Sequence, residues 1–304
     1  PEGALLMTDS VQMSPTEPVR HRDERLRRAL FRFRQSTLSM IGAAIVAVVL
    51  FFAVFGTVLA PFPDHVAGAV DTANQFQAPS AAHLFGTNEL GQDVLSLVMA
   101  GATVSVLAGF GVVLIGSVIG TLVGAIAGFV GGWTDEGLMR LTDLTLTIPS
   151  LILAMAIVAA LGPGFTNMVI AISLSWWPGY ARLVRGEVLA AREEVYVTAA
   201  RAIGASPARI LFRHILPNVV SPIIVKMSLD MGFAILTVAG LGFIGIGVRP
   251  PTPEWGTLLS LSRANMPGYW WTAMAPGLAM FLAVFGFNLL GDGLRDILDP
   301  KARR

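Results

Sequence analysis

The chain has 304 residues, of which 54% are hydrophobic and only 13% charged, and its formal net charge is +1. Soluble domains usually carry about 25% charged residues, so the composition excludes an ordinary soluble domain. The near-zero net charge gives no field that would favour nucleic acid. The absence of cysteine excludes disulfides, thiolate catalysis and thiolate metal sites.

The N-terminal segment, residues 1–35, is predicted to be a cytoplasmic tail followed by a basic interfacial stretch. Met7 is a candidate natural start, and the first apolar run lies too far in and is too long for a cleavable signal peptide. Leu26, Leu30 and Phe33 recur at helical spacing among seven arginines, as in a helix that lies on an anionic leaflet. A solvated basic tail is the alternative. The arginines are Arg20, Arg22, Arg25, Arg27, Arg28, Arg32 and Arg34.

Six apolar stretches follow within residues 36–304, each close to the roughly 20 residues that a bilayer-spanning helix needs. They are Leu38–Ala60, Val104–Val130, Leu144–Leu161, Met168–Leu183, Val219–Gly247 and Trp270–Leu290. We therefore predict an all-α polytopic membrane protein with six transmembrane helices. The fourth stretch is short and interrupted by Pro178.

The second stretch carries a ladder of glycines at every fourth residue: Gly116, Gly120, Gly124 and Gly128. Such a ladder puts a smooth groove on one helix face, which predicts close helix packing. Lining of a pore is the alternative interpretation.

Lys and Arg accumulate in cytoplasmic loops, so their distribution predicts the orientation. With the N-terminus inside, 18 of the 21 basic residues fall in inner segments, whereas only Arg249 and Arg263 fall outside and Lys226 lies within the fifth stretch. The outer loop, residues 61–100, contains no Lys or Arg. We therefore predict that both termini and the inner loop at 184–217 are cytoplasmic.

The polar segment 193–218 interrupts the apolar chain between the fourth and fifth stretches. Helix formers fill residues 193–202, and Gly204 can take the left-handed conformation that closes a helix. Ser206 is a candidate N-cap of a second helix, which Pro217 is predicted to end. The pattern predicts a helix–glycine–helix platform at a membrane face.

Nothing in the sequence is typical of nucleotide hydrolysis or metal chemistry. A phosphate-binding loop ends in Gly-Lys-Ser/Thr, but neither of the two lysines, Lys226 and Lys301, follows a glycine. The four histidines are far apart and fall on different sides of the predicted topology, and no Ser/His/Asp arrangement stands out. We predict neither catalytic residues nor a metal site, and any ATP hydrolysis belongs to another polypeptide.

Two polar features lie outside the platform. Lys226 and Asp230 are four residues apart, so they can pair on one helix face. Ionisable groups within a span usually face the bundle interior or a water-filled path. The pair is interpreted either as part of a transport path or gate, or as an ion pair that neutralises itself near the inner interface. The outer loop carries Glu89 and Asp93 without a cation, and is a candidate surface for a delivering protein or a solvated loop.

The platform resembles the permease signature of binding-protein-dependent ABC importers: Glu-Ala-Ala, three residues, Gly, nine residues, Ile-x-Leu-Pro. Residues 198–200 (Thr-Ala-Ala), Gly204 and residues 216–217 (Leu-Pro) fall on that spacing. Thr198 stands where glutamate is usual and His214 where isoleucine is usual. Glu194, one turn earlier, is the candidate replacement for the missing carboxylate.

Further motifs are similar to the second of the two permease subunits in dipeptide and oligopeptide importers. They are His83–Asp93, Leu241–Gly247, Pro250–Gly256, Gly291–Asp296 and Leu298–Pro300. In the first, Asp and Arg are commoner than Asn88 and Gln92. The resemblance covers the chain from about Phe31 to the terminus and implies the fold of a type I ABC importer permease with a cytoplasmic coupling loop.

The resemblance also implies partners and a location. A homologous second permease, two ATP-binding domains that carry ATP and Mg, and an extracytoplasmic peptide-binding protein are expected in a bacterial inner membrane, with no cofactor on this chain. Nickel and glutathione are alternative solutes, and an ion-driven secondary transporter or a structural anchor are alternatives outside the family. The implied ATPase-docking residues are Glu194, Tyr196, Thr198, Ala199, Ala200, Arg201, Gly204, Ala205, Ser206 and Arg209.

Overall fold

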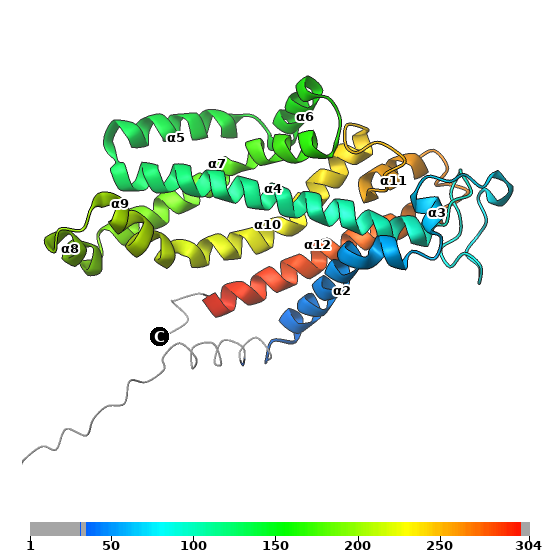
Figure 1. Ribbon diagram of the computed structural model, residues 1–304, viewed down its shortest axis with the longest axis horizontal. Helices are drawn as coiled ribbons and strands as arrows, with labels where there is room; N and C mark the ends of the chain where they lie inside the picture. Colours follow the sequence, from blue (N-terminus) through cyan, green and yellow to red (C-terminus); the bar gives the residue numbers. More distant parts are fainter. Residues whose placement is uncertain (1–30, 32–34, 299–304) are drawn as a thin grey trace, which may run out of the picture.

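The structure is a computed structural model that describes residue 31 and residues 35–298 (Figure 1). The predicted interfacial helix before residue 35 and the end of the last motif lie outside the described residues. The helices are α2 Thr37–Leu59, α3 Pro63–Val66, α4 Val94–Val130, α5 Gly132–Thr147, α6 Ser150–Leu161, α7 Phe165–Arg192, α8 Val195–Ala202, α9 Pro207–Arg209, α10 Leu216–Ile244, α11 Trp255–Ser262 and α12 Trp271–Leu298, with a 3₁₀ turn at Thr72–Asn74 and a π-helical turn at Ile210–Ile215.

The described part of the chain is helical, as predicted, but it does not contain six equally apolar spans. Four helices are long and apolar enough to cross a membrane: α2, α4, the continuous helix Pro207–Ile244, and α12. The pair α5 and α6 makes a fifth candidate. The fourth predicted stretch lies in α7, which is not among the helices that meet this test. Ala171, Ile172 and Tyr180 of α7 are fully buried among other helices. An interior helix needs less hydrophobic surface than one that faces lipid.

The third predicted stretch is not one helix. α5 and α6 meet at 90° around Ile148 and Pro149. Ile148 has extended backbone angles (φ −93°, ψ 126°) because the residue before a proline is forced out of the α region. Leu144 therefore belongs to α5, and only residues from Ser150 onward form α6.

Two other predicted boundaries are wrong. α7 continues through Pro178, which is buried inside the helix; prolines are tolerated in packed membrane helices, where neighbouring groups compensate for the lost hydrogen bond. α4 begins at Val94, within the predicted outer loop 61–100, because the Asp93 side chain accepts a hydrogen bond from the Ser96 N–H at 2.8 Å and caps the helix.

The glycine ladder of α4 packs against α7, as predicted. A Cβ atom at Gly120 would overlap the backbone oxygen of Trp177, and one at Gly124 would overlap that of Ala181. At Gly116 the nearest atom to a Cβ would be 3.7 Å away, an ordinary contact. At Gly120 and Gly124 the backbones of α4 and α7 are therefore closer together than they could be if these positions carried a side chain.

The bundle has two ends of different character (Figure 1). The turns around α8 and α9 project at one end, and the loop that contains α3 lies with α11 at the other. One hydrophobic core joins α2, α4, α6, α7, α10 and α12, and a second, smaller core lies beneath α8. Segments predicted to lie on opposite sides of a membrane are thus at opposite ends of the described bundle.

Candidate functional site

The predicted docking segment, residues 194–209, folds through local capping as the sequence predicts. α8 ends at a left-handed Gly204 (φ +78°), where the Ala205 N–H donates to the Ala200 oxygen at 3.0 Å. The Ser206 hydroxyl then accepts from the Arg209 N–H at 3.4 Å, with proline at the first helical position. The glycine sets the bend between the two helices.

Pro217 does not end the second helix. A π-helical turn at Ile210–Ile215 joins α9 directly to α10, so the helix runs on from Pro207 to Ile244. The Leu216 N–H donates to the Leu211 oxygen, five residues back. This wider turn carries the chain into α10, and Pro217, which has no N–H to donate, follows directly after it.

The predicted docking residues do not all face outward. Ala200 is 5% exposed and packs with Val197 against the smaller core, so it has no surface for a partner. Ala205 is half-buried. The others are exposed: Glu194, Tyr196, Thr198, Ala199, Arg201, Gly204, Ser206 and Arg209. Within the described part of the chain, no ion pair involves Glu194, Arg201 or Arg209.

Two apolar residues of this segment were missed. Val195 is 81% exposed and Ile203 is 85% exposed, one at each end of α8. Burying either side chain would be favourable, since burial of a side chain of this size contributes about 1.5–3 kcal/mol. Two β-branched apolar residues in a polar segment could have indicated an exposed apolar surface. An eight-residue helix is too short, however, for its periodicity to show which face packs against the rest of the protein.

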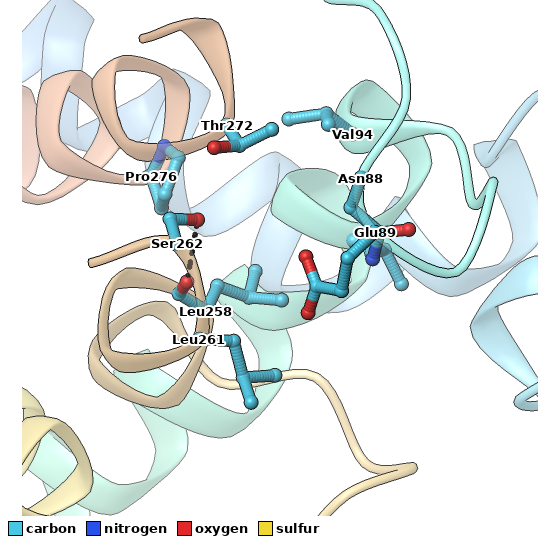
Figure 2. Close-up of a pocket in the computed structure, with 9 residues that line it drawn as sticks. Asn88, Glu89, Val94, Leu258, Leu261, Ser262, Thr272 and Pro276 are labelled. Atoms are coloured by element: carbon cyan, nitrogen blue, oxygen red, sulfur yellow. Dashed lines mark hydrogen bonds between the residues drawn. The ribbon is translucent and has the colours of Figure 1, made fainter. Parts of the chain in front are cut away.

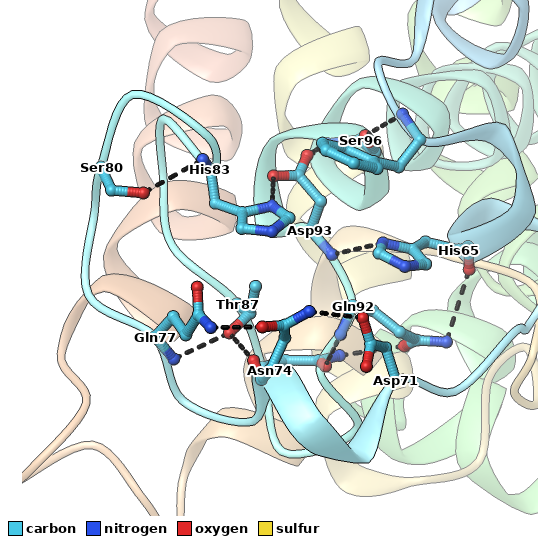
Figure 3. A network of polar contacts seen from close by, with 12 residues as sticks. His65, Asp71, Asn74, Gln77, Ser80, His83, Thr87, Gln92, Asp93 and Ser96 are labelled. Carbon is cyan, nitrogen blue, oxygen red and sulfur yellow. Dashed lines mark hydrogen bonds and ion pairs between the residues drawn. The ribbon is translucent and has the colours of Figure 1, made fainter.

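The outer loop is an ordered polar network rather than a free acidic surface (Figure 3). Asp93 is 1% exposed; besides capping α4, it contacts the His83 Nδ1 atom at 3.0 Å. Its backbone N–H donates to the Nδ1 atom of His65 at 2.9 Å. The Asp93 carboxylate is therefore not part of the loop's surface, and the role of the loop, as a surface for a delivering protein or a solvated loop, stays a prediction. His65 and His83, treated as distant, lie on either side of Phe62 with ring centroids 5.2 and 4.7 Å away.

Glu89 lies at the base of the same loop and is half-buried. Figure 2 shows Asn88 and Glu89 facing Leu258 and Leu261 of α11 across a small pocket. The loop therefore lies next to α11. No local pattern predicts this contact, because the two segments are about 170 residues apart in the chain.

Lys226 and Asp230 pair on α10 as predicted, with Nζ and Oδ2 3.0 Å apart. Their side chains are 31% and 17% exposed, and the Lys226 ammonium lies 4.9 Å from the centre of the Tyr180 ring. On the neighbouring helices, Arg182 pairs with Asp143 at 2.6 Å. The geometry confirms the predicted pairing.

Comparison with known proteins identifies the family to which the chain belongs. Residues 120–304 match the model of the binding-protein-dependent transport system inner membrane component, and residues 24–79 match that of the N-terminal TM domain of oligopeptide transport permease C. The chain belongs to this permease family. A glutathione transport system permease protein, GsiD, of Escherichia coli O6:K15:H31 (strain 536) is 44% identical over 90% of this chain and 89% of its own.

A second relative of the permease is the probable D,D-dipeptide transport system permease protein DdpC of Escherichia coli (strain K12), 42% identical over 98% of both chains. Among solved structures, the inward-facing MetNI methionine ABC transporter has a TM-score of 0.53 at 16% identity, over 66% of this chain and 96% of that one. The latter likeness shows a shared fold.

One buried carboxylate lies at the end of the bundle that carries α11, and sequence reasoning did not single it out. Glu254 is fully buried and caps α11, accepting from the N–H groups of Gly256 and Thr257 at 2.8 Å each. It also accepts from the Ser105 hydroxyl of α4 at 3.3 Å. Burial raises the pKa of the Glu254 carboxyl, and these hydrogen bonds oppose the rise.

Replacing Glu254 should lower stability substantially. Glu254→Ala removes a cap, worth about 1 kcal/mol, and leaves buried hydroxyl and N–H groups unsatisfied at about 1–3 kcal/mol. Glu254→Gln should have an intermediate effect, because both carboxylate oxygens accept and an amide has one acceptor. Thermal unfolding of the purified permease in detergent measures the difference. Ser36→Ala, which removes the cap of α2, is the matched control with a smaller expected loss; equal losses would contradict the assignment.

Proposed function

We propose that this permease is a pore-forming subunit of an ATP-driven, binding-protein-dependent importer of small peptides. Family membership supports the transport role, and the two relatives named for dipeptide and glutathione transport support a peptide solute. Glutathione is itself a small peptide, so it stays an alternative within the same solute class. The proposal includes a bacterial inner membrane with both termini cytoplasmic, as the positive-inside count favours.

The proposed complex has parts that this chain does not supply. A second permease would complete the pore, an extracytoplasmic protein would deliver the peptide, and two ATP-binding domains carrying ATP and Mg would drive transport. The chain has no Gly-Lys-Ser/Thr sequence, so we assign hydrolysis to those domains. The coupling requires that ATP-bound and ATP-free states bind the permease differently.

The exposed docking segment is the observation that carries this proposal. Val195 and Ile203 offer apolar anchors on either side of α8, and Glu194, Arg201 and Arg209 offer charges around them. Apolar anchors ringed by charged groups are typical of protein interfaces. Glu194 would replace the glutamate that the family carries at the position of Thr198. We assign the ATPase contact to this surface.

Ile203→Asp should reduce recovery of the ATPase subunits with the tagged permease at least tenfold, since a tenfold change corresponds to about 1.4 kcal/mol and a buried isoleucine contributes more. Leu90→Asp, on an exposed apolar residue of the outer loop at the other end, is the matched control. Copurification from membranes, followed by the ATPase rate, measures both.

Equal recovery with Ile203→Asp and Leu90→Asp would exclude this surface as the docking site. A secondary transporter makes a different prediction: the purified single chain would accumulate peptide under an ion gradient with no ATPase present. That result would overturn the proposed importer.

A further inference from the structure

A cleft lined by both polar and apolar side chains lies on one face of the bundle between α5, α6, α7 and α10. Its volume is about 400 Å³, and its lining includes Ser150, Ser175, Trp176, Lys226, Asp230 and Thr237. On α10 the lining residues 226, 230, 233 and 237 are spaced three or four apart, so they form one stripe along the helix. The Lys226–Asp230 pair sits in the middle of an otherwise apolar helix.

This face differs from the surface that the permease presents elsewhere. α2 exposes apolar side chains, with Val54 66% exposed and Val58 80% exposed, as lipid contact requires. The cleft instead exposes part of an ammonium and a carboxylate, which are costly against hydrocarbon and are normally found facing a bundle interior or a water-filled path. The cleft therefore faces water or a second subunit rather than lipid.

The polar character continues toward the end of the bundle that carries α8. Gly179 lines the cleft on α7, and Arg182, one turn further along the same helix face, pairs with Asp143 of α5. The side chains of Arg182 and Asp143 are 56% and 59% exposed. Two ion pairs thus follow one another along the open side of α7, while its opposite side packs against the glycines of α4.

We propose that the Lys226–Asp230 cleft is a solute-binding site on the translocation path, and that it binds the charged ends of a zwitterionic solute. Lys226 takes the carboxylate and Asp230 takes the ammonium, each exchanging its intrachain partner for one on the solute. This inference rests on the proposed importer function and adds the class of solute and the residues that meet it.

The charge balance of the pair determines which solute fits. A net-neutral zwitterion leaves both protein charges paired during the exchange, whereas a lone cation or a lone anion leaves one of them without a partner. The Tyr180 hydroxyl, which is buried and has no hydrogen-bond partner among the described residues, lies on the side chain whose ring supports the Lys226 ammonium. The Tyr180 ring, which is itself fully buried, thus adds a favourable contact for the Lys226 ammonium beside the cleft.

Cysteine accessibility tests whether the cleft is aqueous. The chain has no native cysteine, so Phe233→Cys, at a 55% exposed position in the cleft, can be compared with Val54→Cys, at a 66% exposed position on α2. The complete complex is labelled in membrane fragments that are accessible from both sides. A cationic, membrane-impermeant methanethiosulfonate should modify position 233 at least tenfold faster than position 54. Equal rates would overturn the proposal.

Neutralising the pair tests the binding role. We expect the double variant Lys226→Met with Asp230→Leu to assemble with its partners in normal yield, since apolar replacement of an ion pair is often neutral. Reconstituted with the binding protein and the ATPases, it should import radiolabelled dialanine at least tenfold more slowly. Uptake within twofold of the unaltered complex would exclude the proposed solute-binding site. Failure to assemble would show that the pair has a structural role, and would also exclude it.

The two experiments separate this inference from the importer function. If the unaltered complex imports no dialanine but position 233 is modified rapidly, the peptide function fails and the aqueous cleft stands. If the unaltered complex imports dialanine and position 233 is as unreactive as position 54, the importer function stands and the proposed solute-binding site in the cleft is wrong.

Discussion

Valine in place of Gly204 should abolish import while leaving the permease in the membrane at its normal level. Gly204 has φ +78°, a region that costs a non-glycine residue about 1–2 kcal/mol and in which a β-branched residue is an outlier. No atom lies within 4 Å of a Cβ built there. The expected defect is therefore a changed angle between α8 and α9, not a clash, and uptake together with the amount in the membrane fraction measures it.

Gly204→Asn is the matched control, because asparagine tolerates the left-handed conformation better than other residues. It should retain most of the transport that Gly204→Val loses. Normal uptake with valine would show that the α8–α9 angle does not matter for coupling.

Alanine at position 120 should destabilise the permease by about 3 kcal/mol, toward the upper end of the range for overpacked cores. A single methyl group there would overlap the Trp177 carbonyl oxygen, which is part of the α7 backbone and cannot turn aside as a side chain does. The helices must separate along their longest interface. Thermal unfolding in detergent and the recovered yield should both fall.

Gly116→Ala tests the same reasoning on the same helix face. Its nearest neighbour would be 3.7 Å from the new methyl group, so stability should change by less than about 1 kcal/mol, the scale of a glycine-to-alanine difference in a helix. Similar losses for Gly116→Ala and Gly120→Ala would mean that helix propensity or insertion, rather than the close approach of α7, decides the outcome.

Features set by neighbouring residues could be predicted from the sequence. Ser206, Gly204 and the proline after the cap act within a few residues of one another, and each takes the conformation expected of it. The pairing of Lys226 with Asp230 is equally local, since four residues make one helical turn. The apolar stretches likewise predicted most of the membrane helices.

Features that depend on distant packing could not be predicted in the same way. Pro178 and Pro217 both lie within continuous helices, one inside a packed helix and the other after a π-helical turn. Ala200 turns inward because a small core formed by α7 and α10 lies beneath it. Glu254 accepts a hydrogen bond from Ser105, about 150 residues away in the chain, a partner that no local pattern indicates.

The helix that begins beside the docking segment has a mechanical consequence. Pro207–Ile244 runs for 38 residues without a break, which at about 1.5 Å per residue makes it roughly 57 Å long. Ser206 caps one end, and a left-handed Gly245 closes the other, next to the α11 segment that Glu254 caps. The π-helical turn Ile210–Ile215, Pro217 and Pro222 lie near the end that adjoins α8, and helices bend at such features. We therefore expect a tilt imposed at α8 to be absorbed partly at this bend before it reaches α11.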